Sequence, residues 1–378
     1  MDWCAGSARR PLRPPVAADP RPARHAGVTA LLATEGLDAL LVTSLANIRY
    51  LTGFSGSAGL LLVHAGGLLL VTDFRYQEQA EAEVDGAARV VVERTSAWER
   101  LFREAGGDRL GTIGYEAHAL SAKDAERLAV LAKGWHWRAA PELVERLRVK
   151  KSAAEVAAVR AAAQLGSAAL AATLARVRAG QTEREIAGAL EAELRRLGSE
   201  NHPFPTIVAS GPRTAWPHAR TSGRAVARGE WLLLDFGAQV DGYCADITRT
   251  VLVGARATDA QRTLYELVRT AQRNARERIR AGMPARDADA LARDLIEARG
   301  FGDAFGHSLG HGLGLEVHEA PRLSRTNAEP LAVDAVVTIE PGVYLAGQGG
   351  VRLEDDVHLA ADGPVLLSDG ATDLVELC

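Results

Sequence analysis

Five side chains that carry charge or bind metals stand within or beside apolar, strand-forming runs in the second half of the chain. They occur in the blocks LLLDFG, YCADITRT, GHGLGLEVHE, VTIEPG and GVRLEDD, and they are Asp235, Asp246, His311, Glu340 and Glu354. Four carboxylates repel one another inside an apolar fold unless a cation compensates their charge. Two divalent metal ions that share a water or hydroxide would do so. The set therefore predicts a two-metal site and hydrolysis by a metal-activated water.

The ligand types indicate which metals are expected. Carboxylate oxygens with one imidazole favour hard or borderline divalent ions, so Mn²⁺ or Co²⁺ is expected ahead of Zn²⁺. His311 lies between Gly310 and Gly312, which allow the close backbone approach that a ligand on a tight turn needs. His307 and His318 fall in the same short segment, and this spacing suits one metal ligand with two substrate-facing partners.

Arg352 stands two residues before Glu354 in an extended segment, so both side chains should point to the same face. A guanidinium in that place can orient a metal-binding carboxylate through a bidentate hydrogen bond. A solvated surface arginine is the alternative. Asp241 is interpreted as a turn residue, and Asp355 and Asp356 as strand-end groups or as support for the ligands. A lone strand-end carboxylate would more often cap a turn, so the prediction depends on the whole set.

Composition excludes several classes of protein. The 378 residues are 47% hydrophobic and 24% charged, as in a soluble globular protein long enough for two domains. A net charge of −4 gives no electrostatic reason to expect a nucleic-acid or membrane partner. The three cysteines are widely spaced and form no CxxC pair, which fits a reducing cytoplasm, where we expect the protein to act.

The chain divides into three parts by pattern. Residues 1–26 are rich in Pro and Arg and are expected to be a disordered extension. Residues 27–148 alternate helical and strand patterns and are expected to form an α/β domain. Residues 149–378 are expected to form the domain that carries the site, and Ser-x-x-Glu and Thr-x-x-Glu capping boxes open its first two helices at Ser152 and Thr182. The expected N-terminal helices and strands span 28–36, 39–42, 60–63, 68–71, 90–93, 96–105, 112–115 and 121–133.

An internal repeat is visible within the second domain. Residues 174–198 and 276–300 share the order helix, Arg-Ala-Gly turn, helix and terminal Gly. Each copy is followed by a histidine, an apolar strand that ends in a carboxylate, a glycine turn and a second carboxylate. The first copy supplies Asp235 and Asp246 and the second supplies Glu340 and Glu354. Chance similarity is the alternative, but a real duplication would place two half-sites about a pseudo-twofold axis.

Together these blocks resemble a known group of enzymes. ASGPRTAWPH, LLLDFGAQVDGYCADITRT, HSLGHGLGLEVHEAPRLS, VTIEPGVY and GVRLEDD resemble the metallopeptidases of the aminopeptidase P and prolidase family, which have the pita-bread fold. NIRYLTGFSGSAGLLLV and TDFRYQEQA resemble the creatinase-type N-terminal domain of the same family. The resemblance implies an α/β creatinase-type domain followed by an α+β pita-bread catalytic domain with an internal pseudo-twofold duplication.

The resemblance also implies roles for individual residues. His218 and His318 would lie at the reacting peptide, and His307 would line the side that receives the proline. Glu340 would accept the proton of the attacking water, and Arg352 would support the bridging ligands. The metal ligands would be Asp235, Asp246, His311, Glu340 and Glu354, of which Asp246 and Glu354 would bridge the two ions.

The expected activity is attack of a metal-bridging hydroxide on the peptide bond before proline. Its substrates would be proline-containing peptides, and the family implies a homodimer. An Xaa-Pro aminopeptidase, which acts on longer peptides, is favoured by the form of the N-terminal domain and of the GHGLGLEVHE block. An Xaa-Pro dipeptidase (prolidase) is the alternative. A metal-free relative, either creatinase-like or a binding protein, is a remote third, because the chain has the full ligand set.

Overall fold

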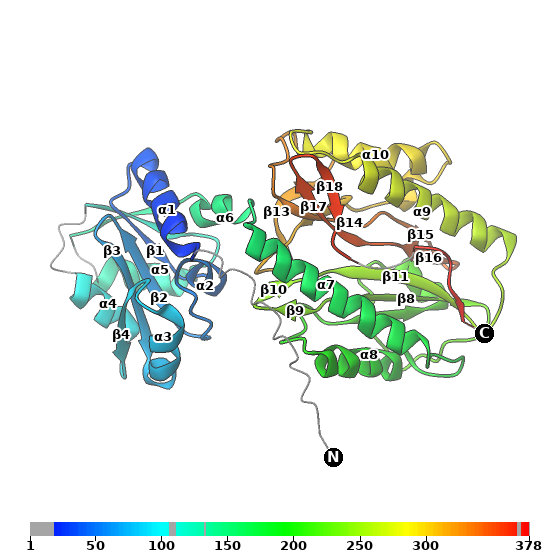
Figure 1. The fold of residues 1–378 in the computed structure, drawn as a ribbon, viewed down its shortest axis with the longest axis horizontal. Coiled ribbons are helices and arrows are strands. Elements are labelled where there is room, and N and C mark those ends of the chain that lie inside the picture. The colour runs from blue at the N-terminus through cyan, green and yellow to red at the C-terminus, as the bar shows by residue number, and fades with distance from the viewer. Residues whose placement is uncertain (1–18, 106–110, 132–133, 369–371, 378) are drawn as a thin grey trace, which may run out of the picture.

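The computed structural model describes residues 19–105, 111–131, 134–368 and 372–377, and it contains two domains (Figure 1). The N-terminal domain extends to the helix α6 (Leu143–Arg148). The catalytic domain begins with the long helix α7 (Ala153–Leu174), which lies beside the N-terminal domain in Figure 1. The site residues predicted from the sequence all belong to the second domain.

The N-terminal domain is built on a six-stranded mixed sheet with the order β4-β3-β2-β1-β5-β6. Strands β1 to β3 pair antiparallel, whereas β4, β5 and β6 join in parallel. The strands are β1 (Ala39–Val42), β2 (Leu60–His64), β3 (Gly67–Asp73), β4 (Arg89–Glu93), β5 (Thr112–Glu116) and β6 (His136–Ala140).

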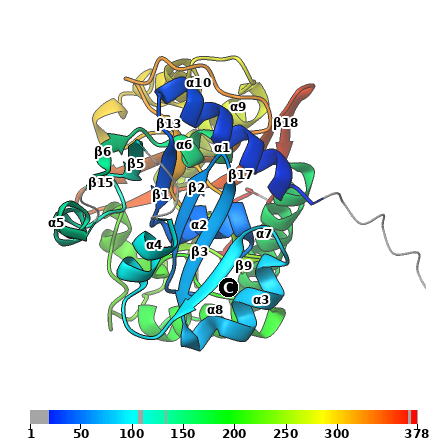
Figure 2. The ribbon, with the colours of Figure 1, turned by 90° about the vertical axis from the view of Figure 1, so that its left-hand side faces the viewer.

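Helices cover both faces of this sheet (Figure 2). Alternate strand residues point to opposite faces, so Leu40 and Val42 pack under α1, α2 and α6, while Ala39 and Leu41 face α4 and α5. In addition to α6, the helices of this domain are α1 (Arg21–Glu35), α2 (Leu45–Thr52), α3 (Gln77–Val84), α4 (Ala97–Ala105) and α5 (Ala122–Leu131).

The helix predicted from Val28 ends on left-handed Gly36 as expected but already begins at Arg21, so the end of the extension predicted over 1–26 is helical. Residues 1–18 lie outside the described part of the chain. The earlier start has a tertiary cause that local sequence does not reveal, because the Arg21 guanidinium donates hydrogen bonds to the carbonyl oxygens of Thr52 and Val84. The pattern also missed α3, α6 and β6.

Both predicted capping boxes are present at the start of the catalytic domain. The Ser152 hydroxyl and the Glu155 carboxylate cap α7, and Thr182 with Glu185 caps α8 (Glu183–Leu197). The first of these helices ends at Leu174. It is long and apolar enough to span a membrane by length and composition alone, but its apolar residues pack into the core of the catalytic domain.

The catalytic domain repeats one element order twice, as the sequence predicted. In each half two helices precede a sheet, and the sheet orders are β19-β11-β8-β7 and β13-β12-β14-β17-β18. All neighbouring strands in the two sheets are antiparallel except β11 and β19, which are parallel. The first half contains β7 (Ile207–Ser210), the 3₁₀ turn η2 (Gly211–Ala215), β8 (Glu230–Phe236), β9 (Gln239–Val240), β10 (Tyr243–Cys244) and β11 (Ile247–Val253), with β19 (Glu376–Leu377) from the C-terminus. The second contains α9 (Asp259–Arg278), α10 (Ala285–Glu297), β12 (Gly310–Gly312), β13 (Glu319–Leu323), β14 (Val336–Ile339), β15 (Gly342–Leu345), β16 (Gly349–Arg352), β17 (Asp355–Ala360) and β18 (Gly363–Leu366).

The two halves are joined by an ion cluster around Asp355, whose carboxylate is fully buried. Its carboxylate accepts hydrogen bonds from Arg249 on β11 at 2.7 Å and from Gln272 and Arg276 on α9 at 2.6 and 2.9 Å. The Ser368 hydroxyl donates a fourth at 2.7 Å. Asp355 is therefore a structural anchor next to the predicted ligand Glu354.

Replacing Asp355 with Ala should destabilise the catalytic domain strongly. It leaves the buried Arg249 guanidinium without its carboxylate, and breaking a buried ion pair in this way costs about 3–5 kcal/mol. Urea denaturation followed by circular dichroism should show this loss, with the exposed Asp362→Ala as the control. Equal midpoints for the two variants would contradict this interpretation of the cluster.

Candidate metal centre and substrate cavity

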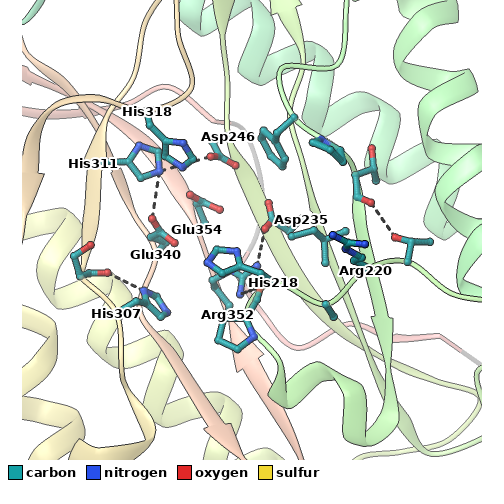
Figure 3. Close-up of a pocket in the computed structure, with 18 of the residues that line it drawn as sticks. His218, Arg220, Asp235, Asp246, His307, His311, His318, Glu340, Arg352 and Glu354 are labelled. Carbon is teal, nitrogen blue, oxygen red and sulfur yellow. Dashed lines mark hydrogen bonds and ion pairs between the residues drawn. The ribbon is translucent and has the colours of Figure 1, made fainter. Parts of the chain in front are cut away.

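A cavity of about 980 Å³ opens between the two halves of the catalytic domain (Figure 3). All nine site residues predicted from the sequence line it. They are His218, Asp235, Asp246, His307, His311, His318, Glu340, Arg352 and Glu354. The fold thus brings together, from positions more than a hundred residues apart, every residue that the sequence singled out as part of a site.

The four carboxylates stand at equivalent places in the two halves. Asp235 lies near the end of β8, and Asp246 directly precedes its antiparallel partner β11. Glu340 directly follows β14, and Glu354 directly precedes its antiparallel partner β17. Each strand pair therefore presents two carboxylates at one end, from backbone that the sheets hold rigidly.

His311 lies at the centre of β12 and depends on its two glycines. A Cβ atom at Gly310 would lie 2.0 Å from the Thr338 carbonyl oxygen, and one at Gly312 would lie 2.1 Å from that of Ala320. Only glycine permits such close backbone packing. The His311 Nδ1 donates to the Gly312 carbonyl oxygen at 3.0 Å, which leaves Nε2 free to face the carboxylates.

The geometry of this cluster fits a divalent metal. Ligand atoms of Asp246, His311 and Glu354 lie within 4.8 Å of one another. The His311 Nε2 is 3.8 Å from an Asp246 oxygen and 3.4 Å from a Glu340 oxygen. The Asp246 Oδ1 is buried and has no hydrogen-bond partner within the described residues. A buried carboxylate oxygen without a partner is costly, and a bound cation would satisfy it.

The electrostatics point in the same direction. Burial, together with the neighbouring carboxylates, raises the pKa of Asp246 and Glu354 well above their ordinary values. Burial raises the pKa of Glu340 to about 8, although Arg352 opposes the shift. Burial lowers the pKa of His311 to about 4, so its imidazole is neutral at pH 7, the form that binds metals. Without a metal the site must therefore hold protons on its carboxylates.

Arg352 is the one cation inserted among the ligands, and it points to them as its spacing predicted. Its buried guanidinium donates to an Asp235 oxygen at 2.6 Å, to the Thr248 hydroxyl at 3.1 Å and to the Tyr344 hydroxyl at 2.9 Å. The Thr248 hydroxyl in turn donates to Glu354 at 2.6 Å. Arg352 thus orients one ligand directly and reaches a second through a hydroxyl that belongs to the other half of the domain.

Three histidines line the cavity without belonging to the ligand set, and they differ in how their ring nitrogens are hydrogen-bonded. The two nitrogens of His307 lie 2.8 Å from the Ser308 carbonyl oxygen and 2.9 Å from the Tyr344 hydroxyl, and burial lowers its pKa to about 4. This residue therefore offers the cavity only its ring surface. His218 and His318 are exposed to the cavity, and the His318 ring packs edge-on against His311 at 4.4 Å.

Sequence patterns missed several residues that line the cavity or support its lining. Tyr344 bridges Arg352 and His307, although nothing in the block VTIEPGVY marked its hydroxyl. Arg220 and Arg322 line the cavity as two further cations. The apolar side chains of Phe204, Pro205 and Ile207 form another part of its wall. Their proximity to the prolines and histidines of the motif blocks was the only available signal.

Glu319, beside His318, was also missed, and it connects the cavity to the N-terminal domain. Its carboxylate is held by Arg148 at the end of α6 and, at 3.0 Å, by the Lys151 ammonium. Burial alone would raise the pKa of Glu319, but the two cations hold it below its ordinary value. The segment that carries His318 is therefore fixed from the junction between the domains.

A fold of two similar halves around such a cluster defines a metal-dependent hydrolase. The chain belongs to metallopeptidase family M24, whose model matches residues 157–361, and residues 24–150 match the creatinase/prolidase N-terminal domain. The fold predicted from the sequence, a creatinase-type domain followed by a pita-bread catalytic domain, is confirmed.

Two curated relatives align with most of the chain. An uncharacterized peptidase, YqhT of Bacillus subtilis, is 40% identical over 85% of this chain and 90% of its own length. An Xaa-Pro dipeptidase of Pyrococcus horikoshii is 33% identical over 84% of this chain and 89% of its own length.

Solved structures give the same picture. An Xaa-Pro dipeptidase from Bacillus anthracis superposes with a TM-score of 0.91 and 34% identity, over 94% of this chain and all of that one. An X-Pro aminopeptidase from Thermotoga maritima superposes with a TM-score of 0.86 and 35% identity, over 93% of this chain and 99% of that one.

Metal binding should release protons, because the raised pKa values mean that the metal-free carboxylates hold them. Glu340 keeps its proton up to about pH 8, against an ordinary pKa of 4.5, so metal affinity should rise steeply from pH 6 to pH 8. The raised pKa of Glu340 also affects the stability of the metal-free protein. The folded state holds the Glu340 proton more tightly than the unfolded chain does, so the free energy of unfolding should fall as pH rises toward 8.

Isothermal titration of the metal-free protein with Mn²⁺, in two buffers of different ionisation enthalpy, counts the protons released. At least one proton per protein is expected at pH 6.5, and fewer in Glu340→Gln. A wild-type count of zero would contradict the predicted pKa shifts.

Proposed function

We propose that this protein hydrolyses the peptide bond before proline in short peptides and prefers Xaa-Pro dipeptides. The observation that carries the proposal is the convergence of the five-ligand cluster with His218 and His318 in one cavity. Family membership supports the metal-dependent hydrolase chemistry, and the names of the relatives support the Xaa-Pro specificity.

Asp235, Asp246, His311, Glu340 and Glu354 would hold two divalent ions, and we propose Mn²⁺ because the ligands are mainly carboxylates. When bound, such ions lower the pKa of a water molecule toward neutrality and polarise the peptide carbonyl. Glu340, deprotonated when the ions are bound, would accept a proton from the attacking water and return it to the leaving nitrogen. His218 and His318, both exposed to the cavity, can hydrogen-bond the carbonyl oxygen as it gains charge.

Dipeptides are favoured here, whereas the sequence pattern favoured an aminopeptidase acting on longer peptides. Two of the relatives described above are named Xaa-Pro dipeptidases. Arg322 also supports this choice, because it lies on β13 opposite His311 and its side chain makes no hydrogen bond or ion pair within the described residues. A free guanidinium in the cavity suits the terminal carboxylate, which a dipeptide carries directly after the scissile bond.

An Xaa-Pro aminopeptidase is the second candidate, since the Thermotoga maritima structure carries that name. Comparing release of alanine from Ala-Pro and Ala-Pro-Ala decides between the two. We expect kcat/KM for the dipeptide to exceed that for the tripeptide by about tenfold or more, the worth of one charged hydrogen bond. Equal or faster tripeptide cleavage would favour the aminopeptidase, and cleavage of neither peptide would refute both candidates.

Glu340→Gln should lower kcat on Ala-Pro by about 10²- to 10⁴-fold, because an amide cannot relay the proton of the attacking water. Mn²⁺ content, measured by mass spectrometry, separates this effect from loss of metal. Removing the metal from the wild-type enzyme with a chelator should abolish activity, and adding Mn²⁺ should restore it. Near-normal turnover of Glu340→Gln would remove this residue from the chemical step.

A further inference from the structure

We propose that Glu183 is a positioning residue: its buried carboxylate binds both ends of the segment that carries His218, and so determines where that imidazole lies in the cavity. The inference rests on the proposed function, because it assigns a support to a group that would stabilise the reacting carbonyl. Glu183 itself lies outside the cavity lining, and no sequence pattern connected it with the site.

His218 needs such a support because its own ring is not held. The ring lies in the cavity (Figure 3), and it forms no hydrogen bond, ion pair or ring contact with any residue that the structure describes. In contrast, both nitrogens of His307 are hydrogen-bonded, and the His318 ring packs against His311. The position of the His218 imidazole therefore depends on its main chain.

Glu183 is the first residue of α8, and its carboxylate joins the two ends of that stretch of main chain. One oxygen accepts hydrogen bonds from the Ser210 N–H and hydroxyl, both at 2.9 Å. The other accepts from the Ser222 N–H at 2.9 Å and from the Ser222 hydroxyl at 2.6 Å. Arg213, within the segment, adds an ion pair at 3.0 Å. One side chain thus bonds the beginning, the interior and the end of the segment.

The charge of Glu183 strengthens these bonds. The residue is fully buried. Burial alone would raise the pKa of its carboxyl group, but the hydrogen bonds from Ser222, Ser210 and Arg213 hold the pKa below its ordinary value. Hydrogen bonds to a charged acceptor are about twice as strong as neutral ones. Because any shift of this carboxylate would leave buried donors unpaired, it holds the segment rigidly.

The middle of the segment is bonded to the second half of the catalytic domain. The Gly350 N–H donates to the Thr214 hydroxyl at 2.7 Å, and the Arg352 guanidinium donates to the Pro217 carbonyl oxygen at 3.3 Å. Pro217 directly precedes His218. A change at the base of the segment would therefore move His218 relative to the ligand cluster, and a misplacement of about 1 Å can cost about 100-fold in rate.

Glu185 is a matched control on the same helix. Its exposed carboxylate caps α8 through Thr182 and forms no bond with residues 210–222. Replacing either glutamate with Gln removes one charge from the first turn of α8, but only Glu183→Gln replaces an acceptor of the two serines with an amide N–H₂. The backbone bonds from α8 to the carbonyl oxygens of Ser222 and Arg224 remain, so the helix should stay in place.

The test measures kcat and KM on Ala-Pro. Glu183→Gln should lower kcat about 10- to 100-fold and change KM less than about threefold, because a hydrogen bond from His218 to the carbonyl oxygen strengthens in the transition state. Glu185→Gln should change neither parameter by more than about threefold. Equal losses of kcat in the two variants, or a raised KM with unchanged kcat in Glu183→Gln, would overturn the inference.

A double-mutant cycle with His218→Ala separates positioning from general damage. If Glu183 acts through His218, adding Glu183→Gln to His218→Ala should lower kcat less than about threefold further. Losses that multiply would overturn the inference, because Glu183 would then act independently of His218. Manganese content should equal that of wild type in every variant, since residues 210–222 supply no predicted metal ligand.

Ser222→Ala keeps the test decisive if Glu183→Gln does not fold. It removes one hydroxyl from the carboxylate and keeps the N–H bond, so kcat should fall about three- to tenfold, the effect of one hydrogen bond. This loss too should disappear in the His218→Ala background. An unchanged kcat in Ser222→Ala would then count against the role of Glu183.

These outcomes differ from failure of the proposed function. If the wild-type enzyme cleaves only Ala-Pro-Ala, the same cycle is run on the tripeptide. If it cleaves neither Ala-Pro nor Ala-Pro-Ala, the Xaa-Pro activity is wrong and the role of Glu183 in it is wrong as well. If it cleaves Ala-Pro and Glu183→Gln keeps the full kcat, only the role of Glu183 is wrong.

Discussion

Repulsion among four neighbouring carboxylates, three of them buried, is the constraint on which the catalytic domain depends. Among the residues that the structure describes, Arg352 is the only arginine or lysine that forms an ion pair with one of them, and its guanidinium bonds Asp235 directly. The negative charges of the other three carboxylates must be compensated by protons or by metal ions. Burial accordingly raises the pKa values of Asp246, Glu340 and Glu354. A fold can keep such a cluster only if its backbone is rigid enough to prevent the carboxylates from separating.

The rigidity comes from the way the two halves interlock. The Thr250 hydroxyl both donates to the Arg352 carbonyl oxygen and accepts from its N–H, and the Glu354 N–H donates to the Thr248 carbonyl oxygen. Strand β11 of the first half is thereby joined to the ligand segment of the second. Directly behind this contact, Asp355 is enclosed by cations from β11 and α9. Glu354 therefore cannot move without breaking its hydrogen bonds to β11.

Much of this was readable from sequence, because the signals are local. Short sequence patterns predicted the carboxylates at the ends of apolar strands, the close packing around His311 and the two helix caps. The internal repeat predicted that the two halves would place their carboxylates together. What the sequence did not reveal depends on tertiary contacts. Tyr344, Glu319 and the early start of α1 at Arg21 are held by partners far along the chain, and no local pattern encodes them. The preference for peptide length also depends on tertiary contacts, and no local pattern encodes it.

The distribution of arginine partners separates stability from specificity in this molecule. Arg148 is buried and bonded to Asn47 of the N-terminal domain as well as to Glu319, so it fixes the segment of His318 relative to the first domain. Arg352 is equally buried and fixes the ligands. Arg220 and Arg322 are exposed in the same cavity and lack such bonds. Since a guanidinium that is already saturated cannot discriminate between substrates, Arg220 and Arg322 are the arginines of the cavity lining, among the described residues, that remain available to a charged ligand.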